Sequence, residues 1–410
     1  MQVPNPPSKS PANPKSPAQI PNMSGVRHAV TIEDLRRLAI ARWPRFVGDY
    51  VEKGGGDGSG VLSNVEAFTR LRFLPRALVD VTPASTETSI FGRSYACPFG
   101  ISAVGTSAIY RRHADLLLAE AAREANLPFI LSGVSSSTIE QVVRVAPANT
   151  WSQLYGAKEP VQTDRLVRRY CDAGVSVLVF TVDTPVRQFS EVAARSGISL
   201  ASGVTLKTLP RTALDVVAHP AWAWEYVRGG GQPTLQSWQA YAPAGSDARG
   251  VVSFFAERWL GNQTWRDLDR VRKLWPGKLV VKGLVHPDDA QAALQAGADA
   301  VTVSNHGGNK LDRMRASIED LPGVVERVGG NGQILFDGGI RRGSDIVMAA
   351  ALGAQFSFVG RATLYGVGAG GLEGALRAIE ILRSGLAYTM AMIGCKTVSD
   401  IGPGHVAAAV

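Results

Sequence analysis

The chain has 410 residues, of which 45% are hydrophobic and 19% charged, so it can build a large folded core. Its formal net charge is +8, but the basic residues are scattered, which argues against a nucleic-acid-binding protein. Cys97, Cys171 and Cys395 are far apart, which argues against disulfides or a metal site and favours a cytoplasmic, reducing compartment.

The first residues differ in composition from the rest of the chain. Residues 1–28 are rich in proline and poor in large apolar side chains, which predicts a disordered tail. The folded domain is then expected to cover residues 29–410. It begins with helices over residues 31–55, where Thr31 can cap the first turn.

From residue 98 onward, short apolar segments alternate with helical ones, such as 113–125, 288–296 and 343–352. The predicted strands are 98–105, 128–134, 150–155, 175–183, 278–284, 300–307, 333–339 and 356–361. Eight such repeats favour an α/β fold, a parallel (β/α)₈ TIM barrel. A doubly wound open sheet is the alternative.

One long insertion, residues 186–275, follows the fourth predicted strand. It contains six of the eight tryptophans: Trp222, Trp224, Trp238, Trp259, Trp265 and Trp275. An excursion of this length is typical of a lid or a binding device. Its aromatic side chains suggest peripheral contact with the cytoplasmic face of a membrane. A lid packed on its own aromatics, or an oligomer contact, is the alternative.

Polar side chains stand at the carboxyl ends of the predicted strands, where the active site of this barrel fold gathers. His306 is the candidate general base, because Asp183 at an equivalent strand end could orient its imidazole. Lys282 would place a buried positive charge beside an anionic ligand. A structural ion pair between Lys282 and Asp183 is the alternative.

The last two strand ends have the composition of a phosphate site. The segment Asp337-Gly-Gly-Ile-Arg-Arg-Gly343 offers backbone N–H groups, an arginine and a helix start, and Gly360-Arg361 offers a second set. Loops after the seventh and eighth strands often bind phosphate in this fold. The glycines could instead serve only as helix caps.

With these residues the chain resembles the FMN-dependent α-hydroxy acid oxidases and dehydrogenases, over roughly residues 31–402. The shared motifs are Ser304-Asn-His-Gly-Gly, Gln153-Leu-Tyr, Thr181-Val-Asp-Thr-Pro, Val281-Lys-Gly and Asp337-Gly-Gly-Ile-Arg-Arg-Gly. The resemblance implies an FMN-dependent oxidoreductase that removes a proton and a hydride from a C–H bearing a hydroxyl group. His219-Pro-Ala-Trp-Ala-Trp is similar to the membrane-associated bacterial members, whose electrons pass to quinone.

The resemblance implies a role for each site residue. His306 is the base with Asp183 behind it, Tyr155 meets the substrate oxygen, and Lys282 lies by the flavin N1–C2=O edge. Tyr50 meets the substrate carboxylate. The other residues expected to bind the cofactor are Ala103, Val104, Gly105, Ser132, Gln153, Thr181 and Ser304 at the ring, and Asp337, Gly338, Gly339, Arg341, Gly360 and Arg361 at the phosphate. Implied partners are a small-molecule substrate, an acceptor (oxygen, quinone or cytochrome) and further copies of the chain in a tetramer.

Two arginines of the family pattern are absent. Asn309 replaces the arginine of SNHGGRQLD, and Ser190 replaces a second one in an ungapped alignment. Because a charged hydrogen bond contributes about 1.5–3 kcal/mol, recognition of a substrate carboxylate should weaken. The neighbouring Lys310 and Arg187 are expected to point elsewhere. We therefore expect a substrate other than a simple short 2-hydroxy acid. The alternatives are an amine or peptide-derived substrate, or a flavin-binding barrel without dehydrogenase activity.

Overall fold

In the computed structural model, which describes residues 25–186, 189–191, 209–259 and 261–409, eight parallel strands close into a barrel. Neighbouring strands follow the order β10-β11-β4-β5-β6-β7-β8-β9. The strands are β4 (Phe99–Ile101), β5 (Phe129–Leu131), β6 (Thr150–Leu154), β7 (Val177–Thr181), β8 (Lys278–Leu284), β9 (Ala300–Val303), β10 (Gln333–Asp337) and β11 (Phe356–Val359). This closed order confirms the predicted barrel and rules out the open sheet.

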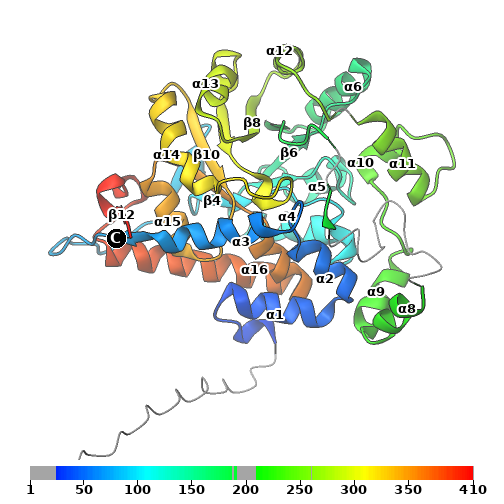
Figure 1. Ribbon diagram of the computed structural model, residues 1–410, viewed down its shortest axis with the longest axis horizontal. Helices are drawn as coiled ribbons and strands as arrows, with labels where there is room; N and C mark the ends of the chain where they lie inside the picture. Colours follow the sequence, from blue (N-terminus) through cyan, green and yellow to red (C-terminus); the bar gives the residue numbers. More distant parts are fainter. Residues whose placement is uncertain (1–24, 187–188, 192–208, 260, 410) are drawn as a thin grey trace, which may run out of the picture.

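A helix follows each barrel strand and covers the outside of the barrel (Figure 1). These helices are α4 (Ala114–Glu124), α5 (Ile139–Val145), α6 (Pro160–Asp172), α12 (Trp265–Leu274), α13 (Pro287–Gln295), α14 (Ser317–Val328), α15 (Gly343–Ala351) and α16 (Arg361–Met392). The three predicted helical segments match α4, α13 and α15 to within one residue at each end. The last helix, α16, is kinked at Gly370 and Gly371.

The elements before the barrel begin earlier than predicted. A short 3-10 helix, η1 (Val26–His28), belongs to the folded domain, because Val26 packs on the hydrophobic core. The predicted tail therefore extends a few residues too far, and residues 1–24 lie outside the described part. The helices α1 (Ile32–Arg42), α2 (Arg45–Glu52) and α3 (Ser59–Glu66) follow, with α1 lying along α16. Thr31 caps α1, as expected.

Apolar side chains seal the amino end of the barrel. The hairpin of β2 (Thr88–Ile90) and β3 (Arg93–Tyr95) contributes Ile90 and Tyr95 to a buried cluster inside the barrel. Trp151 from β6 lies at the centre of this cluster, 5.2 Å from the Phe358 ring and 5.6 Å from the Phe91 ring. A second small sheet pairs β1 (Leu71–Phe73) with β12 (Val406–Ala408). Because the amino end is filled, polar groups can gather only at the carboxyl end.

The insertion is shorter than predicted. Its described helices, α8 (Leu209–Val217), α9 (Pro220–Arg228), α10 (Gln236–Gln239) and α11 (Ala248–Arg258), gather on one side of the molecule, far from the C-terminus (Figure 1). Helix α12, which falls inside the predicted insertion, is the regular barrel helix before β8. Leu268 and Val271 lie on its inner face at helical spacing, Trp275 caps its carboxyl end, and all three are buried. Trp222 and Trp238 are also buried, whereas Trp224 is 63% exposed.

Candidate active site

The loop after β9 holds the candidate base in an uncommon backbone conformation. His306 has a φ of +57°, and Gly307 and Gly308 have φ values of +64° and +73°. Strand pairing therefore ends at Val303, earlier than the predicted strand 300–307. A non-glycine residue with positive φ is rare and persists where surrounding contacts over-determine it.

Those contacts come from Asn305 and the short helix α3. The Asn305 side chain accepts the Gly308 N–H at 3.0 Å and exchanges two hydrogen bonds, of 2.8 and 3.0 Å, with Asn64. Gly308 also lies so close to the Gly60 backbone that a Cβ would approach it within 2.3 Å. The glycine at this position is thus required by the contact between the loop and α3.

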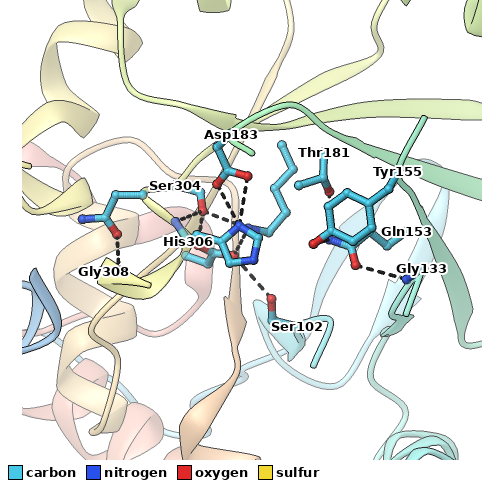
Figure 2. Close-up of polar contacts among 12 residues, drawn as sticks. Ser102, Gly133, Gln153, Tyr155, Thr181, Asp183, Ser304, His306 and Gly308 are labelled. Carbon is cyan, nitrogen blue, oxygen red and sulfur yellow. Dashed lines mark hydrogen bonds and ion pairs between the residues drawn. The ribbon is translucent and has the colours of Figure 1, made fainter. Parts of the chain in front are cut away.

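His306 and Asp183 form the predicted pair. The Nδ1 atom of His306 lies 2.9 and 3.0 Å from the two carboxylate oxygens of Asp183, which follows β7 (Figure 2). Burial lowers the pKa of His306; Asp183 opposes this effect, Lys310 and Lys282 add to it, and the net pKa is below its ordinary value. His306 is therefore neutral at pH 7 and has its Nε2 atom available to accept a proton.

Lys282 lies at the centre of a buried polar network. Its ammonium is 2.9 Å from a carboxylate oxygen of Asp337 and donates to the hydroxyl of Ser304 at 2.9 Å. The Ser304 hydroxyl donates in turn to the same carboxylate. Burial lowers the pKa of Lys282, but Asp337 and Asp183 outweigh it, so the net pKa is raised. The close partner of Lys282 is thus Asp337, and the alternative of an ion pair with Asp183 is wrong.

Gln153 organises the opposite side of the site (Figure 2). Its amide nitrogen donates to the hydroxyls of Thr181 (2.9 Å) and Tyr155 (3.2 Å). Its carbonyl oxygen accepts from the Ser132 hydroxyl and the Gly133 N–H, both at 3.2 Å. Burial, together with the Asp183 charge, raises the pKa of Tyr155, so its phenol stays protonated and can donate a hydrogen bond.

One cavity at the carboxyl end of the barrel collects most of the predicted residues. They are Tyr50, Ala103, Val104, Gly105, Ser132, Gln153, Tyr155, Lys282, His306, Asn309, Asp337, Gly338, Gly339, Arg341, Gly360 and Arg361. Three others, Thr181, Asp183 and Ser304, stand behind the lining and bond to it. Ser190 is not among the lining residues, and its backbone instead bridges to Gly56.

The cavity also contains residues that were not predicted. Lys310 lines it, so the expectation that this side chain points elsewhere is wrong, whereas Arg187 lies outside the described residues. Tyr110 also lines it, and its ring stacks on Tyr50 at 6.5 Å. Nothing in the sequence around Tyr110 signalled this role, because its contact with Tyr50 joins segments 60 residues apart. Lys310 could have been suspected from its place directly after the catalytic segment.

The end of the cavity that is predicted to bind phosphate differs in detail from the expectation. Gly338 and Gly339 have positive φ, and a Cβ on Gly339 would approach the Asn64 carbonyl within 2.1 Å. The backbone N–H groups of Arg341 and Arg342 both donate to Asp345, at 2.8 and 2.9 Å. These two groups are therefore already used, which leaves the glycine turn and the Arg341 side chain for a phosphate.

Arg361 makes a further set of contacts. Its guanidinium donates to the main-chain carbonyls of Val51 (2.9 Å), Gly307 (2.8 Å) and Lys53 (3.2 Å). It thereby ties the end of α2 to the catalytic loop. A guanidinium carries five N–H donors, so two remain for a ligand in the cavity.

Comparison with known proteins accounts for this arrangement. The model of a family described as FMN-dependent dehydrogenase matches residues 39–408. The chain belongs to the FMN-dependent dehydrogenase family. Its fold and cavity are those of an FMN-dependent oxidoreductase.

Curated members of this family are similar along nearly the whole chain. The L-lactate dehydrogenase of Serratia proteamaculans is 34% identical over 368 residues, which cover 90% of this chain and 96% of that protein. The (S)-mandelate dehydrogenase of Pseudomonas putida is 34% identical over 374 residues, 91% of this chain and 93% of that protein.

Solved structures are also similar to this chain along nearly its whole length. The crystal structure of the monotopic membrane protein (S)-mandelate dehydrogenase has a TM-score of 0.87 at 34% identity, covering 93% of this chain and 100% of that chain. The structure of mandelate oxidase has a TM-score of 0.79 at 30% identity, covering 93% and 99%.

The cavity of this FMN-dependent dehydrogenase fits its cofactor. Gln153 and Ser132 line the cavity with polar groups of the kind that bind a flavin ring, although here the Gln153 amide is engaged by Thr181, Tyr155, Ser132 and Gly133. The buried Lys282 ammonium would favour negative charge on that ring. The turn at Gly339 and the Arg341 side chain line the cavity, and the guanidinium supplies the positive charge that a phosphate needs.

Proposed function

We propose that this protein oxidises the C–OH group of a 2-hydroxy acid. The observation that carries the proposal is the pairing of His306 with both oxygens of Asp183 in the cavity that also holds Tyr155 and Lys282. The lactate and mandelate dehydrogenases among the relatives support this substrate class.

Each residue of the site has its own role in this reaction. His306 accepts a proton through its Nε2 atom, and Asp183 stabilises the imidazolium that forms. Tyr155 donates a hydrogen bond to the substrate oxygen, and Lys282 supplies positive charge at the ring edge. FMN, when bound, supplies the acceptor for the hydride. Because Asn309 and Ser190 stand where the family pattern has two arginines, we propose a substrate larger than lactate or glycolate, with additional contacts.

The test is anaerobic mixing with lactate, glycolate and mandelate while the flavin absorbance is followed. The wild-type protein should bleach with a 2-hydroxy acid. His306→Gln should stay yellow and keep its FMN but bleach at least about 10²-fold more slowly, the usual contribution of a general base. The matched control is His286→Gln, since the His286 side chain is 64% exposed at the start of α13. Rapid bleaching by His306→Gln would remove His306 as the base.

A membrane-facing surface is a second proposal. On α8 and α9, Leu214 (74%), Val217 (75%), Trp224 (63%) and Val227 (69%) are exposed, and the Arg228 guanidinium lies 5.2 Å from the Trp224 ring centre. An apolar surface with an interfacial tryptophan and arginine suits a headgroup layer. No helix of the described residues is long and apolar enough to cross a membrane.

We propose that this surface rests on a membrane and that a membrane quinone, rather than oxygen or a cytochrome, takes the electrons. Vesicles of anionic phospholipid with and without quinone provide the test. The Trp224→Ser/Val227→Ser double variant should lose co-flotation with vesicles and quinone-dependent turnover, while flavin bleaching by substrate is unchanged. Equal flotation of both proteins would exclude this surface.

A further inference from the structure

The loop that carries His306 brings a second lysine into the cavity. Lys310 lines the same cavity as Lys282, His306 and Tyr155. Its backbone packs closely on Gly55, because a Cβ on Gly55 would come within 2.3 Å of the Lys310 carbonyl. The Gly55 N–H also donates to the Gly308 carbonyl at 3.1 Å. The side chain of Lys310 therefore starts from a fixed point beside the base.

The charge of Lys310 is not neutralised by a close partner. Lys282 has Asp337 at 2.9 Å, and both oxygens of Asp183 are taken by His306. Among the described residues, none forms an ion pair within 4.0 Å of the Lys310 ammonium. Burial lowers the pKa of Lys310, and Asp183 only partly compensates. A half-buried cation without a counter-ion, facing a cavity, favours an anionic ligand.

We propose that Lys310 binds the carboxylate of the substrate and so determines its specificity for acids. The inference rests on the proposed oxidation of a 2-hydroxy acid. It assigns to Lys310 the charge that Asn309 cannot supply. An ammonium is a compact charge with rotatable donors, so it holds a carboxylate without the planar two-point fit of arginine. Asn309 lines the same cavity and can add a neutral amide donor.

Binding of an anion at Lys310 has a consequence for His306. The charged groups around His306 are Asp183 after β7, Lys282 on β8 with Asp337 of β10 behind it, Lys310 on the loop, and Arg361 of α16 at the Gly307 carbonyl. Lys310 lowers the pKa of His306 in the ligand-free protein. A bound carboxylate offsets that charge, so the base gains proton affinity only when an acid substrate is in place.

The first test measures binding rather than turnover. The FMN-loaded wild type, Lys310→Met and Lys310→Arg are titrated with benzoylformate and with its neutral amide, with flavin absorbance as the readout. Lys310→Met should weaken benzoylformate about 10- to 100-fold, the range of a charged hydrogen bond, and change the amide by less than about twofold. Lys310→Arg should retain most of the preference for the anion. Lys273→Met, which removes an exposed lysine of α12, is the matched control.

The preference for anion over amide is a ratio, so partial loss of folded protein does not affect it. An unchanged ratio in Lys310→Met overturns the inference, as does a wild type without any preference for the anion. If the wild type oxidises 2-hydroxy acids but Lys310→Met binds normally, only this inference fails. If the wild type prefers the anion yet oxidises no 2-hydroxy acid, the proposed function fails and the Lys310 comparison still decides the inference.

A pH profile separates this role from a merely structural one. Removal of the Lys310 charge should raise the pKa of His306, so the acid limb of kcat/KM should move to higher pH in Lys310→Met and stay in place in Lys310→Arg. A limb that stays in place in both variants would contradict the electrostatic link between Lys310 and His306.

Discussion

At the scale of single residues, the site is organised by buried charges that compensate one another in pairs. Asp183 pairs with His306, and Asp337 pairs with Lys282, so each pair has one acid and one base. Burial of an unpaired charge would be costly, which explains why each of these carboxylates lies beside a basic side chain. Lys310 lines the same cavity without an ion-pair partner among the described residues, so it can meet an anionic ligand.

The pH dependence of flavin reduction should reflect the first pair. The base must be neutral, and its pKa lies below the ordinary 6.5, so the rate should fall only as the pH drops through a value below 6.5. Asp183 raises the pKa of His306, so Asp183→Asn should move this acid limb to still lower pH. It should also slow reduction by roughly 10²–10⁴-fold, because the imidazolium loses its partner.

Stopped-flow bleaching between pH 4.5 and 8 measures both effects, with Asp269→Asn on α12 as a control, since Asp269 is 59% exposed. A limb that moves to higher pH in Asp183→Asn would contradict the assigned electrostatics.

At the scale of elements, the turn Gly54–Gly56 joins two segments of the site. The Gly55 N–H bonds the catalytic loop at the Gly308 carbonyl, and the Gly56 N–H bonds the Phe189 carbonyl at 3.0 Å. The turn thus holds the segment around Ser190 close to the loop of Lys310, although the two segments are far apart along the chain. Glycine is required at Gly54 and Gly55 because a Cβ there would collide with the backbone of the His306 loop.

Gly55→Ala should therefore loosen the loop. A Cβ within 2.3 Å of the Lys310 carbonyl must displace main chain. We expect benzoylformate to bind at least about fivefold more weakly and overpacking to reduce stability by about 1–3 kcal/mol. Gly404→Ala is the control, because a Cβ there meets nothing within 4 Å. Equal binding and equal thermal stability in both variants would show that the turn does not position the loop.

A buried acid at the start of α4 should make stability depend on pH. Asp115 is 2% exposed and accepts the Ser136 N–H at 2.9 Å, and burial raises its pKa to about 6. Because the pKa is higher in the folded state, the stabilisation is present below pH 4 and is lost as the pH rises through 6. The loss should reach about 3 kcal/mol, at about 1.4 kcal/mol per pKa unit.

Urea unfolding of wild type and Asp115→Asn between pH 4 and 7 tests this expectation. The variant should lack this component of the pH dependence, because an amide does not titrate in this range. Its amide oxygen can still accept the Ser136 N–H, so the local structure should be kept. Parallel pH profiles for the two proteins would contradict it.

At the scale of the whole molecule, the barrel is closed at one end and functional at the other. The hairpin of β2 and β3 packs on Trp151, which is 1% exposed, and this apolar plug directs all ligand access to the carboxyl end. Trp151→Ala should cost about 3–5 kcal/mol of unfolding free energy, because a large cavity remains in the plug.

Trp224→Ala is the matched control and should change stability by less than about 0.5 kcal/mol, since Trp224 is largely exposed. Thermal and urea unfolding measure the difference. A small effect of Trp151→Ala would show that the plug repacks. The expected tetramer stays a prediction, which light scattering after size-exclusion chromatography would check.

The sequence alone determined the barrel and the general place of the site. Eight apolar segments, each followed by a helical one, carry that information locally, and closure of a parallel barrel brings their polar ends together. His306, Asp183, Gln153 and Tyr155 therefore meet as predicted. The reaction class was readable for the same reason: the chemistry depends on residue types at strand ends.

Only the tertiary structure decided which partner each charged side chain of the site contacts. The partner of Lys282, the three carbonyls around Arg361 and the direction of Lys310 depend on contacts between segments far apart in the chain. The same holds for α12, because the burial of one of its faces depends on the elements that pack against it. Side-chain direction in a loop is set by what packs against its backbone, and for Lys310 that is Gly55. The absence of an arginine could be predicted from the sequence, but the direction of the neighbouring Lys310 side chain could not.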